Sequence, residues 1–386
     1  MRVVARFLTG AALASLISGA AKASAALIVP AYNSAPYGKS VFLDFDGDNT
    51  PTWGTYSPGV TSAYDIDGDP TTFSAQELEN IQLIWQGVSE KFSPWRLNVT
   101  TVDPGHIQNL STIKVVIGGD GSWAPPNVGG IAIHSSFAIA GFPNVAFVFP
   151  DNLGGGNPRY VAEASAHEAG HSFGLSHQSL YDASGNLLAE YNPGNAERAP
   201  IMGRSYFSTR GTWWNGPTEE GFRQLQDDMR LLGLTGVTLA NDIGYRTDDH
   251  GDTHDVATPL TIGQDFSISG SGIIEYMTDA DFFSFTTPGG SGRLVADVAP
   301  FASMLDLSLG LYDELGNLLA MSGTPSLGEV IDFTFAPGTY KLGVFSAGAY
   351  GDVGQYFISG TTVPEPAGTA TVLALLASGL SRRRFR

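Results

Sequence analysis

The sequence contains no cysteine among its 386 residues. Disulfides, thiolate metal sites and thiol-based latency are therefore excluded, and stability must come from packing or from bound ions. Basic residues are also scarce, with 20 Lys and Arg against 38 Asp and Glu and a formal charge of −18. Binding to nucleic acid through its phosphates needs clustered cationic side chains, so we expect no nucleic-acid partner.

The remaining composition fits a folded protein with many turns. Hydrophobic residues make up 42% of the chain, which is long enough for two domains with separate cores. The 48 glycines and 22 prolines favour short strands and turns over long helices. We therefore expect β-rich parts.

Three of the seven histidines lie in one short stretch, from His167 to His177. Residues four apart on a helix share a face, with Cβ atoms about 5–6 Å apart, so His167 and His171 can direct two imidazoles to one point. Gly174 follows, and glycine adopts the left-handed turn that ends a helix without a steric penalty. The chain can then bring His177 to the same point as a third ligand. This arrangement predicts a zinc site.

Glu168 lies beside the first of these ligands in the sequence. A catalytic zinc with three protein ligands keeps its fourth position for water, whose pKa falls to about 7 on the metal. A neighbouring carboxylate can accept the proton of that water. Glu168 is therefore the candidate catalytic base, and His167, His171 and His177 are the candidate metal ligands.

The full pattern, HExxHxxGxxH, resembles the active-site motif of the metzincin clan of zinc metalloproteases. The resemblance implies a methionine turn beneath the metal, and Met202 lies 25 residues after His177 in the Pro- and Gly-containing segment 199–203. Some metzincin families add a tyrosine that binds zinc or the oxyanion two residues after this methionine. Here that position is Arg204, and Tyr206 is the nearest candidate for oxyanion support.

The same resemblance implies a zinc endopeptidase that hydrolyses peptide bonds in protein or peptide substrates. Substrates of this clan bind as an extended strand along a sheet edge, for which residues 129–137 are the candidate. Gln178, which follows the third histidine, leaves the family within the clan open. Two other functions also stay open: a cell-surface or matrix binding protein with a structural zinc site, and zinc-dependent hydrolysis of a non-peptide amide.

Both ends of the chain have the features of targeting signals. Residues 1–25 combine basic residues, an apolar run and small residues at a cleavage site, as in a secretory signal peptide. Residues 363–386 contain a Pro-Glu-Pro motif, a short apolar run and an arginine cluster, and they resemble the PEP-CTERM sorting signal of Gram-negative bacteria. The resemblance implies processing by an exosortase-type enzyme, transient membrane contact during export, and a location outside the cell or at its surface.

Between these ends, the patterns predict an α+β protein. Residues 26–245 are expected to form a metzincin-like zinc protease domain, with a mixed twisted sheet and an active-site helix. The expected helices begin at the capping box Ser74-Ala75-Gln76-Glu77 and at Asn157-Pro158. Short apolar runs predict strands at 40–45, 97–102, 113–118, 130–133 and 145–149, and residues 178–216 are expected to be loop-like. A closing helix is predicted over 218–232, with Phe222, Leu225, Met229 and Leu232 on one side.

Helix patterning stops near residue 245, and short alternating strands follow to residue 362. This second region, 246–362, resembles the bacterial pre-peptidase C-terminal domain, which implies an all-β sandwich. His250 and His254 at the boundary could be ligands, but solvated loop histidines are the simpler interpretation.

Two clusters of aspartate, at 46–49 and 65–69, loosely resemble calcium loops. Neither has the glycine and glutamate spacing of an EF-hand, so a calcium site and plain aspartate turns both remain open. The expected cofactors are thus Zn2+ and, with less support, Ca2+. We expect a monomer.

Overall fold

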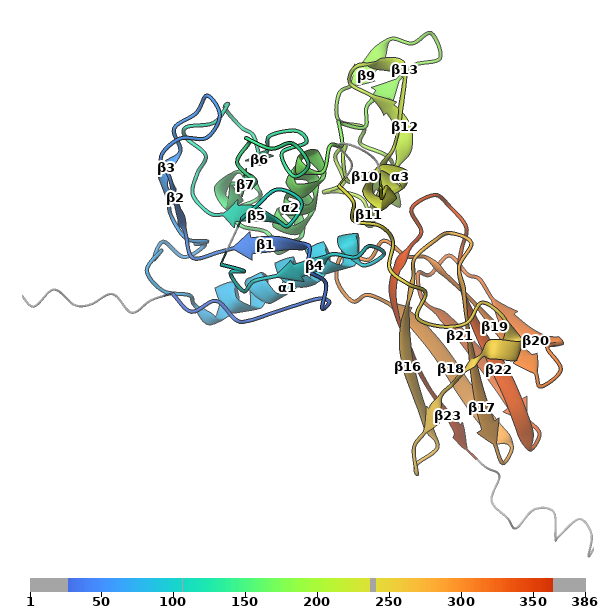
Figure 1. Cartoon of the computed structure of the whole chain (residues 1–386). Helices are drawn as coiled ribbons and strands as arrows, with labels where there is room; N and C mark the ends of the chain where they lie inside the picture. Colours follow the sequence, from blue (N-terminus) through green and yellow to red (C-terminus); the bar gives the residue numbers. More distant parts are fainter. Residues whose placement is uncertain (1–26, 106, 237–240, 364–386) are drawn as a thin grey trace, which may run out of the picture.

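A computed structural model describes residues 27–105, 107–236 and 241–363. The predicted signal peptide (1–25) and all but the first residue of the predicted sorting signal (363–386) lie outside the described residues. Within the described residues, no helix is both long and apolar enough to cross a membrane. Figure 1 shows an N-terminal part with two long helices, an arm of short strands, and a C-terminal part made of long strands.

The N-terminal part is built on a five-stranded sheet in the order β4-β1-β5-β7-β6. Its strands follow the apolar runs that predicted them: β1 (Ser40–Asp44), β4 (Asn98–Thr100), β5 (Thr112–Ile117), β6 (Gly130–Ile131) and β7 (Val145–Val148). The first four in the order are parallel, whereas β6 runs antiparallel to β7. β6 is therefore an edge strand, and it lies within the predicted segment 129–137. A small hairpin, β2 (Asp48–Thr50) with β3 (Gly59–Thr61), follows β1.

Two helices pack against this sheet and against each other. α1 (Ala75–Phe92) begins at the predicted capping box: Ser74 Oγ accepts a hydrogen bond from the Glu77 amide, and the Glu77 carboxylate accepts one from the Ser74 amide. α2 (Pro158–Ser172), preceded by the turn η1 (Pro150–Asn152), begins at its predicted cap, the side chain of Asn157. α2 contacts β5, β6, β7 and α1, so the histidine-bearing helix is held along most of its length.

The segment after α2 differs from the prediction because it forms strands instead of an open loop. These strands are β8 (Leu180–Tyr181), β9 (Leu187–Ala189), β10 (Arg198–Pro200), β11 (Arg210–Thr212), β12 (Asn215–Thr218) and β13 (Gly221–Asp227). The closing helix predicted over 218–232 is wrong, since only α3 (Asp228–Gly233) is helical. β12 and β13 pair as a hairpin instead, leaving Phe222 and Leu225 45% and 70% exposed. The helical spacing of the apolar residues was coincidental.

The expected α+β class is also wrong. The structure is mostly β-sheet, with 37% strand and 14% helix, and its strands are divided among several small sheets. The same cause explains the absence of the predicted closing helix. Between α2 and residue 228, the backbone N–H and C=O groups form hydrogen bonds within two-stranded sheets instead of within a helix.

The C-terminal part consists of two five-stranded sheets, in the orders β14-β17-β22-β19-β20 and β15-β16-β23-β18-β21. After the turn η2 (His254–Val256), the strands are β14 (Thr258–Pro259), β15 (Thr261–Ile262), β16 (Ser267–Ile274), β17 (Ala280–Thr287), β18 (Gly290–Val298), β19 (Leu307–Asp313), β20 (Leu318–Ser322), β21 (Glu329–Phe335), β22 (Gly338–Ser346) and β23 (Gly354–Val363). Side chains of both sheets, such as Phe285 and Leu294, belong to one buried core, and β19 touches β18 and β21 of the other sheet.

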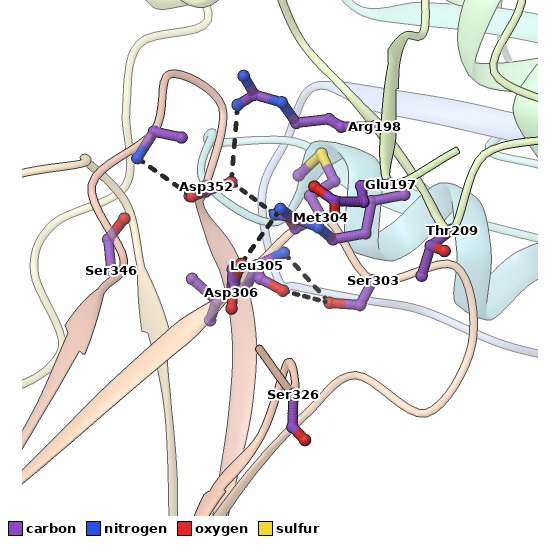
Figure 2. A network of polar contacts seen from close by, with 12 residues as sticks. Glu197, Arg198, Thr209, Ser303, Met304, Leu305, Asp306, Ser326, Ser346 and Asp352 are labelled. Carbon is purple, nitrogen blue, oxygen red and sulfur yellow. Dashed lines mark hydrogen bonds and ion pairs between the residues drawn. The ribbon is translucent and has the colours of Figure 1, made fainter. Parts of the chain in front are cut away.

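Buried polar groups join this part to the rest of the chain. Figure 2 shows Asp306 and Asp352 of the C-terminal part close to Arg198 at the start of β10. Arg210 of β11, 7% exposed, donates from Nη1 to the Met304 carbonyl at 2.8 Å and to Asp352 Oδ1 at 2.5 Å. The contact therefore includes desolvated ion pairs.

A second buried cation extends this junction toward the histidine helix. Lys91 of α1 is fully buried, and its Nζ donates to the carbonyls of Gly211 (2.7 Å) and Ala302 (2.8 Å). The same Nζ lies 3.0 Å from Oε1 of Glu163, one helical turn before His167. One ammonium group thus connects α1, α2, β11 and the C-terminal part.

Candidate metal centre

The three predicted histidine ligands lie together. One ligand nitrogen from each of His167, His171 and His177 falls within 4.8 Å of the other two, and Nε2 of His171 is 3.1 Å from Nε2 of His177. His167 and His171 come from the last two turns of α2, and Gly174, with φ of +94°, turns the chain so that His177 returns. The structure therefore brings together the three side chains that the sequence singled out.

Each imidazole is oriented by a hydrogen bond at its other nitrogen. Nδ1 of His167 lies 2.8 Å from the Ile201 carbonyl, and Nδ1 of His171 lies 2.7 Å from the Leu175 carbonyl. A carbonyl only accepts, so both Nδ1 atoms carry the proton and both Nε2 atoms present lone pairs. Nδ1 of His177 lies 3.1 Å from Oε1 of Glu190, which favours the same tautomer.

Burial keeps these imidazoles neutral. It lowers the pKa of His167 and of His177 to about 4, and the pKa of His171 falls in the same direction because burial and its two neighbours disfavour another positive charge. Metal ligation needs a neutral imidazole. Three neutral nitrogens with converging lone pairs are a donor set that suits zinc, and the residues present therefore fit this metal.

Met202 packs against α2 at Gly170, between the first two histidines. Met202 is fully buried, and a Cβ atom added to Gly170 would stand 2.5 Å from its sulfur. Gly170 is thus the position in α2 where the absence of a side chain lets the sulfur reach the helix backbone between the two ligands. The neighbouring Ile201 supplies the carbonyl that orients His167, so this turn supports the site in two ways.

The candidate base Glu168 is 6% exposed, and burial raises the pKa of its carboxyl to about 8. It lies against the edge strand β6: a Cβ atom added to Gly130 would stand 2.8 Å from Glu168 Oε1. The carboxyl group therefore lies between the metal ligands and the sheet edge predicted to hold substrate.

The predicted oxyanion residue Tyr206 lies on the same side. Its ring contacts Tyr160 at 5.4 Å between centroids, and its hydroxyl would be 3.5 Å from a Cβ atom added to Gly129. Burial raises the pKa of its phenol, and the charge of Glu168 acts in the same direction.

Tyr191 and Glu190 also lie at the histidines, although neither is among the candidate site residues. The Tyr191 ring lies 4.2 Å from that of His177 and 6.1 Å from that of His167, and burial raises its pKa to about 12, with a contribution from Glu168. Tyr191 is one of several aromatic residues in the segment 178–216, whose density favoured a cleft lining and a small core equally, whereas nothing in the local sequence marks Glu190.

The two predicted calcium loops have different surroundings. In the first, Oδ1 of Asp48 lies 2.7 Å from Nζ of Lys114, so the carboxylate of Asp48 already has a cationic partner. In the second, one oxygen each of Asp65, Asp67 and Glu77 falls within 4.8 Å, but these groups accept backbone hydrogen bonds as in ordinary aspartate turns and caps.

Neither boundary histidine belongs to a metal-ligand group among the described residues, and the side chain of His250 is only 14% exposed, so it is not the solvated histidine that we expected. The two ring nitrogens of His250 lie 3.0 Å from Thr258 Oγ1 and 2.9 Å from the Ser271 carbonyl. The ring of His254 lies beside the exposed Asp255.

Comparison with known proteins adds little to this picture. No protein-family model and no curated protein matches the sequence. Among solved structures, the pre-peptidase C-terminal domain of a Bacillus anthracis collagenase matches 30% of this chain and 98% of its own length, with 18% identity and a TM-score of 0.22. PliG from Aeromonas hydrophila, a periplasmic inhibitor of g-type lysozyme, matches 28% and 96%, with 11% identity and a TM-score of 0.22. The mitogen YPM derived from Yersinia pseudotuberculosis matches 27% and 91%, with 12% identity and a TM-score of 0.20.

Proposed function

We propose that this chain is a secreted zinc-dependent endopeptidase. The observation that carries the proposal is the convergence of three neutral imidazoles, each oriented from behind, with the buried carboxyl of Glu168 beside them. The extended histidine motif and the methionine turn, which resemble those of the metzincin clan, add support. A purely structural zinc site is normally closed by a fourth protein ligand, whereas the metal-ligand group formed by the described residues contains three histidines.

Zinc in this site would supply an acidic bound water and polarise the scissile carbonyl. Glu168 would accept a proton from that water at a carboxylate oxygen and then donate it to the leaving amine. His167 and His171 would hold their positions through the carbonyls of Ile201 and Leu175.

A peptide substrate would bind as an added strand along β6. β6 pairs on one side with β7 and is an edge strand of its sheet, and Gly130 lies in contact with Glu168. Backbone hydrogen bonds from this edge would hold the scissile bond beside the base. Peptides with blocked backbone amides should therefore lose affinity.

Incubation of the purified protein with a peptide library, with and without a zinc chelator, tests the proposal. We expect internal cleavage that stops on chelation and returns when zinc is restored. Zinc binding without any cleavage would instead favour the cell-surface or matrix binding protein. Cleavage confined to non-peptide amides would favour the other hydrolase.

Export is proposed from the two predicted end signals alone. Mass spectrometry of the protein recovered outside its natural host cells should find an N-terminus near residue 26 and a C-terminus near residue 363. Recovery of intact ends would contradict processing by signal peptidase and by an exosortase-type enzyme.

A further inference from the structure

His177 differs from the other two candidate ligands in what carries it. His167 and His171 lie in α2, whereas His177 comes after the end of that helix at Ser172 and belongs to no helix or strand. The hydrogen bonds of the helix fix the first two ligands but not the third. The position of His177 therefore depends on contacts made by the residues on either side of it.

Gln226 of β13 holds the backbone directly before His177. The amide of Ser176 donates to Gln226 Oε1 at 2.8 Å, and Gln226 Nε2 donates to the Ser176 carbonyl at 2.9 Å. A side-chain amide that both donates to and accepts from one residue reproduces the paired hydrogen bonds of two antiparallel strands. Gln226 is 7% exposed, so water competes little for these bonds. One side chain thus fixes both backbone groups of the residue that precedes the ligand.

Gln178 holds the chain directly after His177. Its amide donates to the Met202 carbonyl at 2.8 Å. Its side chain is fully buried, and Nε2 donates to the Gln226 carbonyl at 3.0 Å and to Asp228 Oδ1 at 2.8 Å. The third ligand is therefore held from both sides, and both sides meet at Gln226.

Asp228 orients these two side-chain amides. It is fully buried, and its Oδ1 accepts from Nε2 of Gln178 at 2.8 Å and from Nε2 of Gln226 at 2.9 Å. Its Oδ2 accepts from the Trp214 amide at 2.9 Å. A carboxylate only accepts, so Nε2 of Gln226 must face Asp228, which leaves Oε1 to accept from Ser176. Asp228 therefore sets the orientation of Gln226 that the contact with Ser176 requires.

The C-terminal part reaches this network through Tyr350. The Tyr350 hydroxyl donates to Asp227 Oδ1 at 2.5 Å and accepts from the Met229 amide at 3.1 Å. These two partners are the sequence neighbours of Asp228. Arg198 Nη1 also donates to the Tyr350 carbonyl at 2.7 Å. The C-terminal part thus holds the start of α3, where Asp228 lies.

We propose that Gln226 and Asp228 are positioning residues for His177, and that the C-terminal part supports this ligand through Tyr350. The inference rests on the zinc site of the proposed function and adds to it the residues that hold the third ligand. Hydrogen-bond partners that hold metal ligands in place typically contribute about 10- to 100-fold to metal affinity. The C-terminal part then has a task in the zinc site, although none of the three ligands belongs to it.

The zinc dissociation constant of the purified full chain, measured by competition with a chelating dye, tests this proposal. Gln226→Ala should weaken zinc binding by about 10- to 100-fold, and Tyr350→Phe should weaken it less. Gln224→Ala, at an exposed position of the same strand, is the matched control and should keep the parent affinity. Parent affinity in Gln226→Ala, or an equal loss in Gln224→Ala, would overturn the positioning role. Parent affinity in Tyr350→Phe would overturn the support by the C-terminal part.

A second background separates positioning from a general loss of stability. In His177→Ala, zinc binding depends on His167 and His171 alone, and adding Gln226→Ala should weaken it little further, because the effect of Gln226 acts through His177. A merely structural role of Gln226 would weaken binding by the same factor in both backgrounds, and that result would contradict the proposal.

Hydrogen exchange of the zinc-free chain tests the same contacts without the metal. Gln226→Ala should speed amide exchange in the peptide that contains Ser176, whereas Gln224→Ala should not. Unchanged exchange in Gln226→Ala would again refute the positioning role. A parent chain that binds zinc but cleaves no peptide would contradict the proposed endopeptidase, while the affinity and exchange measurements would still decide the role of Gln226.

Discussion

Two groups of neighbouring titratable side chains are built in opposite ways: the three histidines of the candidate metal centre, and a cluster of five carboxylates from Asp248, Asp249, Glu275, Asp279 and Asp281. The histidine site takes its three ligands from eleven consecutive residues, and all three are neutral and nitrogen-donating. The carboxylate cluster takes its five oxygen donors from segments up to 33 positions apart, from Asp248 to Asp281, and carries a large negative charge when ionised. A site made by one helix and its turn can be found by its spacing, whereas a site made by the packing of a linker on a sheet cannot.

The two groups also differ in how their side chains avoid an unfavourable buried charge when no metal is bound. His167 and His171 donate hydrogen bonds to backbone carbonyls, and burial lowers the pKa of His167 so that it stays neutral. The carboxylates retain unpartnered oxygens and can only lose charge by holding protons. We therefore expect metal to matter for chemistry at the histidine site, and proton binding to matter for stability at the carboxylate cluster.

The largest effect should follow Glu168→Ala. Removal of a general base typically costs about 10²- to 10⁴-fold in rate, and the three ligands remain in place. The variant should keep its zinc, measured by elemental analysis, and its Tm, while kcat/KM on a cleaved peptide falls by that factor. Activity near that of the parent chain would remove Glu168 from its proposed role.

The second-largest effect should follow the loss of Lys91, the buried cation between the N-terminal and C-terminal parts. Lys91→Ala leaves the buried Glu163 and two carbonyls without their ammonium partner, so the free energy of unfolding should fall by about 3 kcal/mol in a urea titration. The double variant Lys91→Met with Glu163→Gln, which removes both charges, should recover part of this loss. A fall below about 1 kcal/mol for Lys91→Ala would show that the junction does not depend on this ion pair.

The pH dependence of the metal-free protein should have opposite signs at the two sites. The pKa of His167 and of His177 falls from 6.5 to about 4 on folding, so the unfolded chain binds these protons more tightly and stability is lost as pH falls through this window. The pKa of Asp281 rises from 3.8 to about 8 and that of Glu275 from 4.5 to about 10. Here the folded chain binds the protons more tightly, so stability is greatest below pH 4 and is lost as pH rises toward 8 to 10.

Thermal melts across this pH range should separate the two contributions. Glu275→Gln should flatten the alkaline side alone, and His177→Gln the acidic side alone. Because the raised pKa of Glu168 acts in the alkaline direction as well, the informative quantity is the difference between each variant and its parent. A variant that changes both sides equally would contradict this assignment of the two slopes.

The smallest effect should come from an exposed ion pair. Arg293 and Asp332 lie 2.9 Å apart on neighbouring strands, with side chains 58% and 65% exposed. Arg293→Ala should lower the free energy of unfolding by less than about 1 kcal/mol, because water and salt screen exposed charges. A loss comparable with that of Lys91→Ala would contradict the distinction between buried and exposed pairs in this chain.

Local signals predicted the N-terminal elements well. The capping box at Ser74, the cap at Asn157 and the short apolar runs marked α1, α2 and the five strands of the first sheet, because each depends on residues close in sequence. The same reasoning failed over 218–232. There, Phe222 and Leu225 lie in β13, whose pairing with β12 overrode the helical pattern, and only Met229 and Leu232 lie in a helix, α3.

By itself, the sequence predicted that three histidines converge, because their spacing and the turn at Gly174 lie in one short stretch; Met202 was singled out only by the resemblance to metzincins. Only the tertiary structure decided the β-rich class, the approach of Tyr191 to the ligands, the burial of Lys91 between three segments and the gathering of the five carboxylates. The physical reason is the separation in sequence of the residues that each kind of structure brings together. Helix geometry relates residues three or four apart, whereas strand pairing and packing join residues whose separation in sequence carries no periodic signal.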